Sequence, residues 1–321
     1  KSEKAARYAG ISAVKITMIA MLLSLMIISM ALTAFSSLSR SARQTQQLAE
    51  LQQNAQLISS LFQRELTNIG FWGGRAAPTT AVTSVLPAAP VADCANSTLD
   101  SGSFPASGKA FVTLYASLQL NCVPNAIAGS EILQLKRLIG QPTLPAQFRD
   151  NRFYFETDWQ LSRFVDSNSA QLSTERDYWP YQHLVFYLQQ QQLQGLSLPV
   201  LMRKRLSRNA AGVAQISTDS ILDGVERLHF EFGIDNNADG QLDYLLSTAQ
   251  MLPELWQQQG SRIISIRYHI LLRARQPDPN YINQQQYEMG SQLFVAPADH
   301  YRRLLLSSSV FFHNQALQGG A

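Results

Sequence analysis

A continuous apolar stretch near the start of the chain is its strongest pattern. Residues 16–38 form a run of 23 positions without a formal charge. About 20 apolar residues suffice to cross a hydrocarbon core of roughly 30 Å. The stretch therefore predicts a membrane-spanning helix, and the alternative is a helix buried in a soluble domain.

Beyond the stretch the pattern becomes amphipathic. Apolar residues recur three and four positions apart and glutamines lie between them, which is typical of one apolar stripe on a helix. The pattern predicts a single helix over about residues 12–69, ended by Gly70, whose second half must pack on another element. The residues of the stripe are Leu48, Leu51, Ala55, Ile58, Phe62, Leu66 and Ile69.

The rest of the chain changes to a period of two, which is typical of strands. Residues 76–108, rich in Ala, Pro, Thr and Ser, are expected to form an irregular crossing before the strands begin. No parallel strand–helix–strand rhythm is present. The sequence therefore predicts an α+β fold, with a long N-terminal helix packed on an antiparallel β-sheet head. Strands are expected near residues 111–117, 132–139, 153–155, 183–188, 198–206, 225–234, 262–275 and 301–313.

Charge gives the orientation of the predicted span. Lys1, Lys4, Arg7 and Lys15 precede it and are opposed by one acid, so the amino end is expected in the cytoplasm and the head outside it. The formal net charge is only +3. The basic runs 203–205 and 302–303 lie in predicted strands, where neighbours point to opposite faces. A dedicated nucleic-acid-binding surface is therefore not expected.

The chain has two cysteines, Cys94 and Cys122, both in the part expected outside the cytoplasm. Oxidising compartments favour disulfides. We expect a Cys94–Cys122 bond, with two free buried thiols as the alternative.

A loop rich in oxygen-bearing side chains is the sharpest local signal. Asp235, Asn237, Asp239 and Asp243 occupy positions one, three, five and nine of a segment with Gly240 at position six. Hard Ca²⁺ prefers such oxygens, but the bidentate Glu of a full calcium loop is replaced by a leucine at position twelve. The alternatives are a weak Ca²⁺ site, the one candidate cofactor, and a metal-free turn.

Catalytic motifs are not evident in the sequence. It has no nucleophile elbow, no phosphate-binding loop and no dinucleotide glycine fingerprint, and its five histidines show no metal-ligand spacing. We therefore expect no enzymatic activity and no catalytic residue.

The order of these features resembles type IV pilins, most closely the minor pilins of the PilW type. The resemblance covers nearly the whole chain. It rests on short segments at residues 10–12, 18–23, 51–55, 64–66, 70–73, 223–226, 232–235, 239–240, 301–303 and 308–310.

The resemblance implies four parts: a basic leader over residues 1–10, a transmembrane half of the helix over 11–38, an amphipathic half over 39–70 and a head over 71–321. It implies cleavage after Gly10 by the prepilin peptidase and N-methylation at Ile11. It also implies a single-pass inner-membrane protein with a periplasmic head, which joins major and minor pilins and reaches the pilus tip or surface on assembly.

The chain departs from the family at one position. Pilins carry Glu five residues into the mature chain, where this sequence has Lys15. In the pilins that Glu is thought to offset the positive amino terminus of a neighbouring subunit. Lys15 cannot do so, which predicts few copies at the tip or in the initiating complex.

Three functions compete at this point. The first is a non-catalytic minor pilin that helps to initiate or cap a type IV pilus. The second is a type II secretion pseudopilin, which shares the same plan. The third, from another class, is a membrane-anchored periplasmic enzyme or ligand-binding domain.

Overall fold

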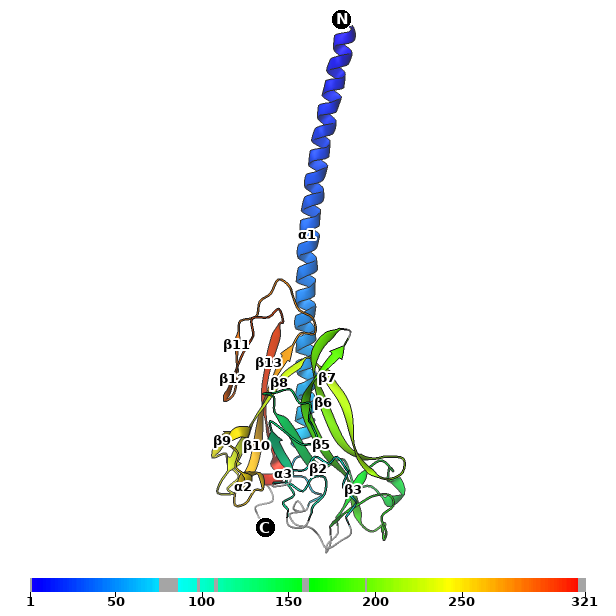
Figure 1. The fold of residues 1–321 in the computed structure, drawn as a ribbon, viewed down its shortest axis with the longest axis vertical. Coiled ribbons are helices and arrows are strands. Elements are labelled where there is room, and N and C mark those ends of the chain that lie inside the picture. Colours follow the sequence, from blue (N-terminus) through cyan, green and yellow to red (C-terminus); the bar gives the residue numbers. More distant parts are fainter. Residues whose placement is uncertain are drawn as a thin grey trace. The chain divides into compact units, whose positions relative to one another are not determined.

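The structure is a computed structural model that describes residues 2–74, 86–96, 99–106, 109–157, 162–193 and 195–316. The chain divides into two compact units, Lys1–Glu50 and Leu51–Ala321. The fold class is α+β, as the sequence predicts: a long N-terminal helix is followed by antiparallel sheets (Figure 1).

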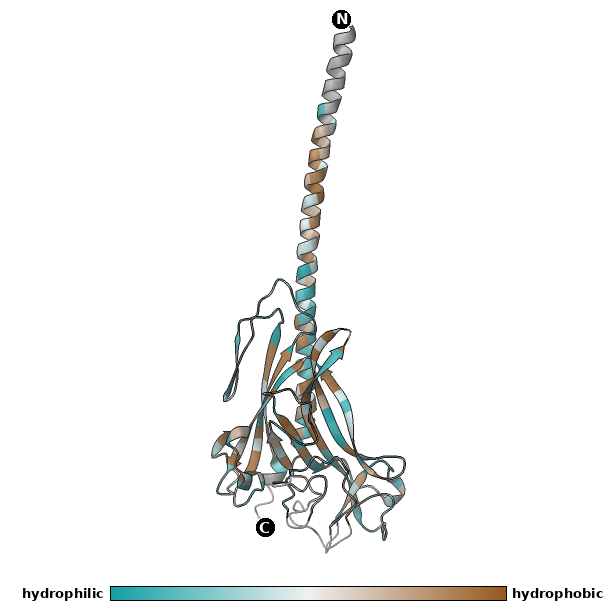
Figure 2. Ribbon diagram, viewed as in Figure 1, coloured by the Kyte–Doolittle hydropathy of each residue, from teal (hydrophilic) through white to brown (hydrophobic). Residues whose placement is uncertain are grey.

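Helix α1 runs over Ser2–Thr67. It begins earlier than the expected residue 12 and ends two residues before the expected residue 69. The turn that follows is closed by Ile69 N–H, which donates to the Leu66 carbonyl at 3.0 Å. Gly70 then adopts φ +79°, a conformation that favours glycine. The first unit consists of the amino-terminal part of α1, and Figure 2 shows its hydrophobic stretch.

The first sheet has seven strands, and its long strand β5 pairs with β2, β3 and β6. β1 pairs with β2, β4 with β3 and β7 with β6, all antiparallel. The strands are β1 (Leu114–Ser117), β2 (Ile132–Leu138), β3 (Phe153–Thr157), β4 (Arg163–Val165), β5 (Asp177–Leu193), β6 (Leu196–Arg208) and β7 (Ala214–Asp223).

The second sheet has four strands in the order β13-β10-β8-β9, and a separate hairpin consists of β11 and β12. These strands are β8 (Val225–Asp235), β9 (Tyr244–Ser247), β10 (Arg262–Arg273), β11 (Gln286–Met289), β12 (Gln292–Val295) and β13 (Arg303–Phe311). Short helices are η1 (Pro145–Gln147), η2 (Thr248–Gln250), α2 (Pro253–Trp256) and α3 (His313–Ala316).

One glycine makes the passage between the sheets possible. Gly224 joins β7 of the first sheet to β8 of the second and adopts φ +81°. A Cβ atom on this residue would lie 2.5 Å from the Arg273 carbonyl oxygen. The backbones therefore approach so closely here that only glycine fits without strain.

The main core forms where the second half of α1 meets both sheets. Leu51, Ile58, Phe62, Leu66 and Ile69 are at most 2% exposed, so the predicted stripe is buried. The exceptions are Ala55, which is partly buried, and the first member, Leu48, which is 42% exposed. Most of the stripe therefore belongs to the second unit and packs inside it.

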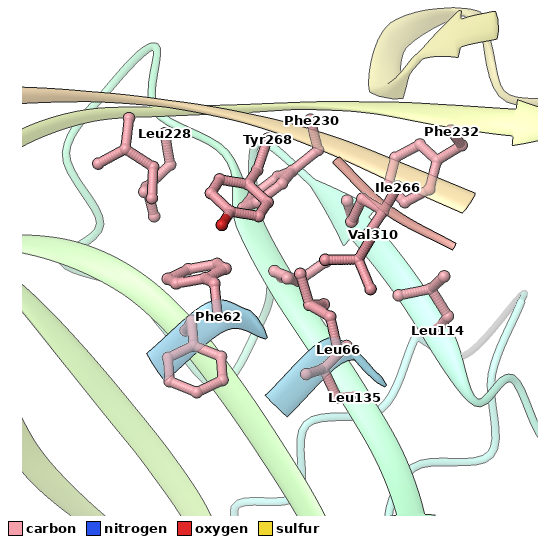
Figure 3. Packing of buried hydrophobic residues seen from close by; sticks show 14 of the residues in the cluster. Phe62, Leu66, Leu114, Leu135, Leu228, Phe230, Phe232, Ile266, Tyr268 and Val310 are labelled. Carbon is pink, nitrogen blue, oxygen red and sulfur yellow. The ribbon is translucent and has the colours of Figure 1, made fainter. Parts of the chain in front are cut away.

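Phe62 is central to this core (Figure 3). Its ring centroid lies 5.5 Å from that of Phe186 in the first sheet and 5.3 Å from that of Tyr268 in the second. Aromatic pairs at such distances are favourable beyond the area that they bury. One side chain of α1 thus joins both sheets.

Candidate functional site

The apolar stretch of α1 is a candidate membrane anchor. Every described side chain from Thr17 to Leu38 is exposed in the structure, and no other described element covers it. Within the described residues α1 is the one helix long and apolar enough to cross a membrane. An exposed apolar helix of this length suits anchoring by a single membrane span. Lys15, whose side chain is exposed, lies just before the stretch.

A buried ion pair ties the end of α1 to the head. Arg137 of β2 pairs with the Glu65 carboxylate and also donates to the Glu65 backbone carbonyl at 2.6 Å. The two side chains are 3% and 7% exposed. Burial lowers the pKa of Arg137, and the nearby Glu65 charge counteracts that effect. A buried charge needs such a partner, so the pair fixes how the helix sits on β2.

The expected disulfide is present between Cys94 and Cys122. A buried polar network adjoins it. Gln134 donates through Nε2 to the Cys94 carbonyl at 3.1 Å and to Asp100 at 3.0 Å. Lys136 donates to both carboxylate oxygens of Asp100, at 2.6 and 2.7 Å. The network and the disulfide together hold the segment before β1 against β2.

The same region brings a serine, a histidine and an aspartate together. The Ser103 hydroxyl lies 2.6 Å from Asp93 and 2.9 Å from His183 Nδ1. In a nucleophilic triad the imidazole stands between the carboxylate and the hydroxyl. Here the hydroxyl stands between them, and Ser103 is fully buried. This order and burial fit a structural hydrogen-bond network rather than acyl transfer.

The oxygen-rich loop folds as a turn stabilised by its own side chains. Asp235 accepts the Asp239 N–H at 3.2 Å and the Gly240 N–H at 2.8 Å, and Asp243 accepts the Asn236 N–H at 2.7 Å. Such bonds are typical of Asx turns. Within the described residues no group of three or more His, Cys, Asp or Glu side chains is arranged to hold a metal ion. The Ca²⁺ interpretation stays a prediction.

The dense basic runs pair with acids. Arg203 contacts Asp219 at 3.1 Å and Arg302 contacts Asp278 at 2.8 Å. Arg303 is buried against Glu226 and Asp299, and these carboxylates raise its pKa although burial opposes them. Arg203, Arg302 and Arg303 therefore have acid partners within the head, whereas Lys204 donates to the Thr218 hydroxyl.

His229 and Glu231 of β8 hold the β11–β12 hairpin through Ser291. His229 Nδ1 lies 2.9 Å from the Glu131 carboxylate, and His229 Nε2 lies 3.1 Å from the hydroxyl of Ser291 in the hairpin turn, so both ring nitrogens are hydrogen-bonded. The Ser291 N–H donates to Glu231 at 2.9 Å, and Glu231 lies 3.5 Å from His269. Sequence reasoning missed this cluster, because its members alternate with apolar residues on strands far apart in the chain.

Comparison with known families adds the deciding observation. Residues 185–314 match the family model of PilW, described as the type IV pilus-assembly protein W. Over these residues the chain is similar to PilW, and we call this part the PilW-type region. No curated protein and no solved structure matches the chain.

The PilW-type region coincides with well-defined parts of the head. It begins within β5, contains β6 to β13 in full and ends within α3. It therefore includes the Gly224 corner, the oxygen-rich loop and the whole second sheet. A PilW-type region indicates a role in type IV pilus assembly and interaction with components of that machinery.

Proposed function

We propose that the chain is a minor pilin, a non-catalytic structural subunit that helps to initiate or cap a type IV pilus. The observation that carries the proposal is the PilW-type match over residues 185–314 in a chain that also begins with an apolar helix. The buried stripe of α1 supports the proposal, because it makes the helix part of the core of the head. A subunit that is held in an assembly by such a helix also has its head held there.

The proposal includes the route to the membrane. The prepilin peptidase cleaves after Gly10, and Ile11 becomes the N-methylated first residue of the mature chain. The head then lies in the periplasm, anchored in the inner membrane. Mass spectrometry of the amino-terminal peptide of the chain purified from its own cells tests this step. An amino terminus at Ile11 that carries one methyl group is expected, and an unprocessed chain would contradict it.

Fractionation tests the main proposal. A tagged full-length chain should co-purify with sheared pili, and deletion of its gene should reduce the number of pili seen by electron microscopy. Retention of the chain in membranes, with pili unaffected by the deletion, would contradict the proposal and favour an anchored enzyme or ligand-binding domain.

The pseudopilin alternative makes a different prediction in the same deletion strain. Loss of type II secretion with normal pili would favour it. Loss of pili with normal secretion favours the minor pilin.

We make a second, separate proposal, that the oxygen-rich loop binds Ca²⁺ weakly. The ligands would be oxygens of Asp235, Asn237, Asp239 and Asp243. These oxygens would contact the ion in place of the hydrogen bonds that now stabilise the turn. Asp235 and Asp243 lie at the ends of the loop, and both carboxylates already face its backbone. Calorimetry at millimolar Ca²⁺ tests it, with Asp239→Asn as the matched variant. An absence of heat, with no calcium-dependent rise in melting temperature, leaves the turn alone.

A further inference from the structure

Strand β13 forms one edge of the second sheet, since it pairs with β10 alone. The Phe312 N–H donates to Ile264 O at 2.7 Å and the Ala274 N–H donates to Arg302 O at 2.8 Å. Residues of an antiparallel strand alternate in the side to which their backbone groups point. The even-numbered residues of β13 therefore bond to β10. The odd-numbered ones direct their N–H and C=O groups to the free edge.

These outward groups have no hydrogen-bond partner among the described residues. Within the described residues, no hydrogen bond joins the backbone of Leu305, Ser307, Ser309 or Phe311 to another element on that side. Ser307, Ser309 and Phe311 are exposed. A row of free donors and acceptors at this spacing is a template for one more extended strand.

The other sheet edges of the described chain are protected in ways that β13 is not. β1, β4, β9, β11 and β12 are only three or four residues long. β7 has ten residues, but it carries Asp219 and Asp223 and its pairing with β6 is interrupted by an irregularity. Short length, charge and bulges are the usual devices against unwanted pairing.

β13 lacks these devices, although near its start Leu305 packs against the cluster of Tyr287 and Met289 from the β11–β12 hairpin. It is nine residues long, its register with β10 is unbroken, and residues 304–311 contain no charge and no proline. Its central serines are small enough for another backbone to approach. Leu304 and Leu306 are half-buried against the main core. An added strand would remove more of their apolar surface from water.

We infer that β13 is a strand-addition site for an extended segment of a different subunit of the pilus assembly. The inference rests on the proposed function, which supplies the class of partner, and β13 lies within the PilW-type region. The partner segment would donate to and accept from the outward backbone groups, with apolar side chains on the face that meets Leu304 and Leu306.

The direction of β13 argues against a second copy of this chain. Asn314 Nδ2, just beyond β13, lies 3.4 Å from the Ile69 carbonyl at the end of α1. β13 and the buried half of α1 therefore end at the same place and run in the same sense along the head (Figure 1). Symmetric antiparallel pairing of two β13 strands would set the buried halves of the two α1 helices in opposite directions.

Photocross-linking in piliated cells tests the inference on the full-length chain. A photoreactive residue at Ser309 should give an adduct with another pilus subunit. The matched control is Ser220, an exposed serine on the edge strand β7. A Ser309 adduct no stronger than the Ser220 adduct would overturn the inference, as would an adduct of two copies of this chain.

A pair of variants isolates the backbone contribution. Ser309→Pro removes an outward N–H while leaving the ladder bonds of the even-numbered residues, whereas Ser309→Ala keeps that N–H. We expect Ser309→Pro to reduce the chain in sheared pili about tenfold, the factor that corresponds to about 1.4 kcal/mol. Ser309→Ala should match the unmodified chain.

Melting temperatures of both variants show whether they remain folded. Equal incorporation of folded Ser309→Pro and Ser309→Ala contradicts strand addition. The unmodified chain could be present in pili and start their assembly while neither the cross-link nor the pair of variants gives the expected result. In that case strand addition at β13 is wrong and the proposed function still stands. If the chain is absent from pili and they form without it, the proposed function fails as well.

Discussion

His183 is a buried histidine in the polar network beside the disulfide. Its Nδ1 lies 2.9 Å from the Ser103 hydroxyl, while its Nε2 is buried without a hydrogen-bond partner. Burial holds the pKa of His183 well below its usual value, and the charge of Lys136 acts in the same direction. The folded protein therefore favours the neutral imidazole.

This predicts a pH dependence of stability. The unfolded chain binds a proton at His183 near pH 6.5, whereas the folded chain resists it, so stability is present above about pH 6.5 and is lost as the pH falls. One such group contributes a slope of up to about 1.4 kcal/mol per pH unit. Thermal melts at pH 7.5 and pH 5 should show a smaller loss for His183→Asn than for the unmodified chain.

The control for that experiment is His313→Asn, because His313 is exposed. It should lose as much stability between the two pH values as the unmodified chain. Equal pH slopes for His183→Asn and His313→Asn would contradict the role of His183.

The buried pair of Glu65 and Arg137 gives a second prediction at this scale. Glu65→Gln removes the countercharge of a buried guanidinium and should lower the free energy of unfolding by about 3–5 kcal/mol. The matched control is Arg64→Ala, because Arg64 also contacts Glu65 but its side chain is 70% exposed. That change should cost at most about 1 kcal/mol. Urea unfolding in detergent micelles, followed by tryptophan fluorescence, measures both, and similar losses would show that Glu65 has no special role.

At the scale of elements, the sequence predicts those helices and strands whose apolar residues recur with a regular period. The α1 stripe and the long strands β2, β5, β6, β8 and β10 follow from apolar spacing, and the structure confirms them with boundaries shifted by a few residues. Residues 111–113 are not in a strand, and His313, expected at the end of the last strand, begins α3. β4, β7, β9, β11 and β12 were missed.

The missed strands share a physical reason. β7 is half-exposed over most of its length and mixes polar with apolar residues, so no alternation marks it. The other four have three or four residues each, too few for a period to appear. Their strand conformation depends on partners that are distant in sequence.

The Gly224 corner gives a prediction about an element boundary. In Gly224→Ala a residue with a Cβ atom must adopt a left-handed φ, which costs roughly 1–2 kcal/mol. The new Cβ atom would also clash with the Arg273 carbonyl oxygen. Gly240→Ala is the matched control, because Gly240 has φ +84° but nothing within 4 Å of its Cβ position. Overpacking typically destabilises a protein by a further amount of about 1–3 kcal/mol. The free energy of unfolding of Gly224→Ala should therefore be lower than that of Gly240→Ala by about this amount. Equal midpoints in urea would mean that the corner can relax.

At the scale of the whole molecule, predictability differs between parts of the candidate site. The membrane anchor and the disulfide follow from composition and from a count of two cysteines. The Glu65–Arg137 pair does not, since its members are 72 residues apart and each reads as an ordinary polar position. The free edge of β13 is equally invisible, because which strands lie at an edge depends on the order of the complete sheet.

The position of Lys15 bears on where the chain lies in an assembly. An unpaired charge within an apolar helix bundle is costly. In a filament of pilins, Lys15 would approach the positive amino terminus of a neighbouring subunit and add repulsion where the family's Glu adds attraction. The repulsion is absent at the tip, where no neighbour lies beyond the subunit, and there the lysine side chain can also extend toward a polar boundary.

We therefore expect few copies of the unmodified chain, confined to the pilus tip or the initiating complex. Lys15→Glu should leave the head fold intact, since Lys15 lies outside the head unit, and should let the chain enter the shaft. Lys15→Arg keeps the positive charge and should keep the tip distribution, so it separates charge from the substitution itself. Immunogold labelling of full-length filaments measures both, with a melting-temperature comparison to confirm folding. Label along the whole shaft for the unmodified chain, or the same distribution for Lys15→Glu and Lys15→Arg, would show that the charge at this position does not decide where the subunit goes.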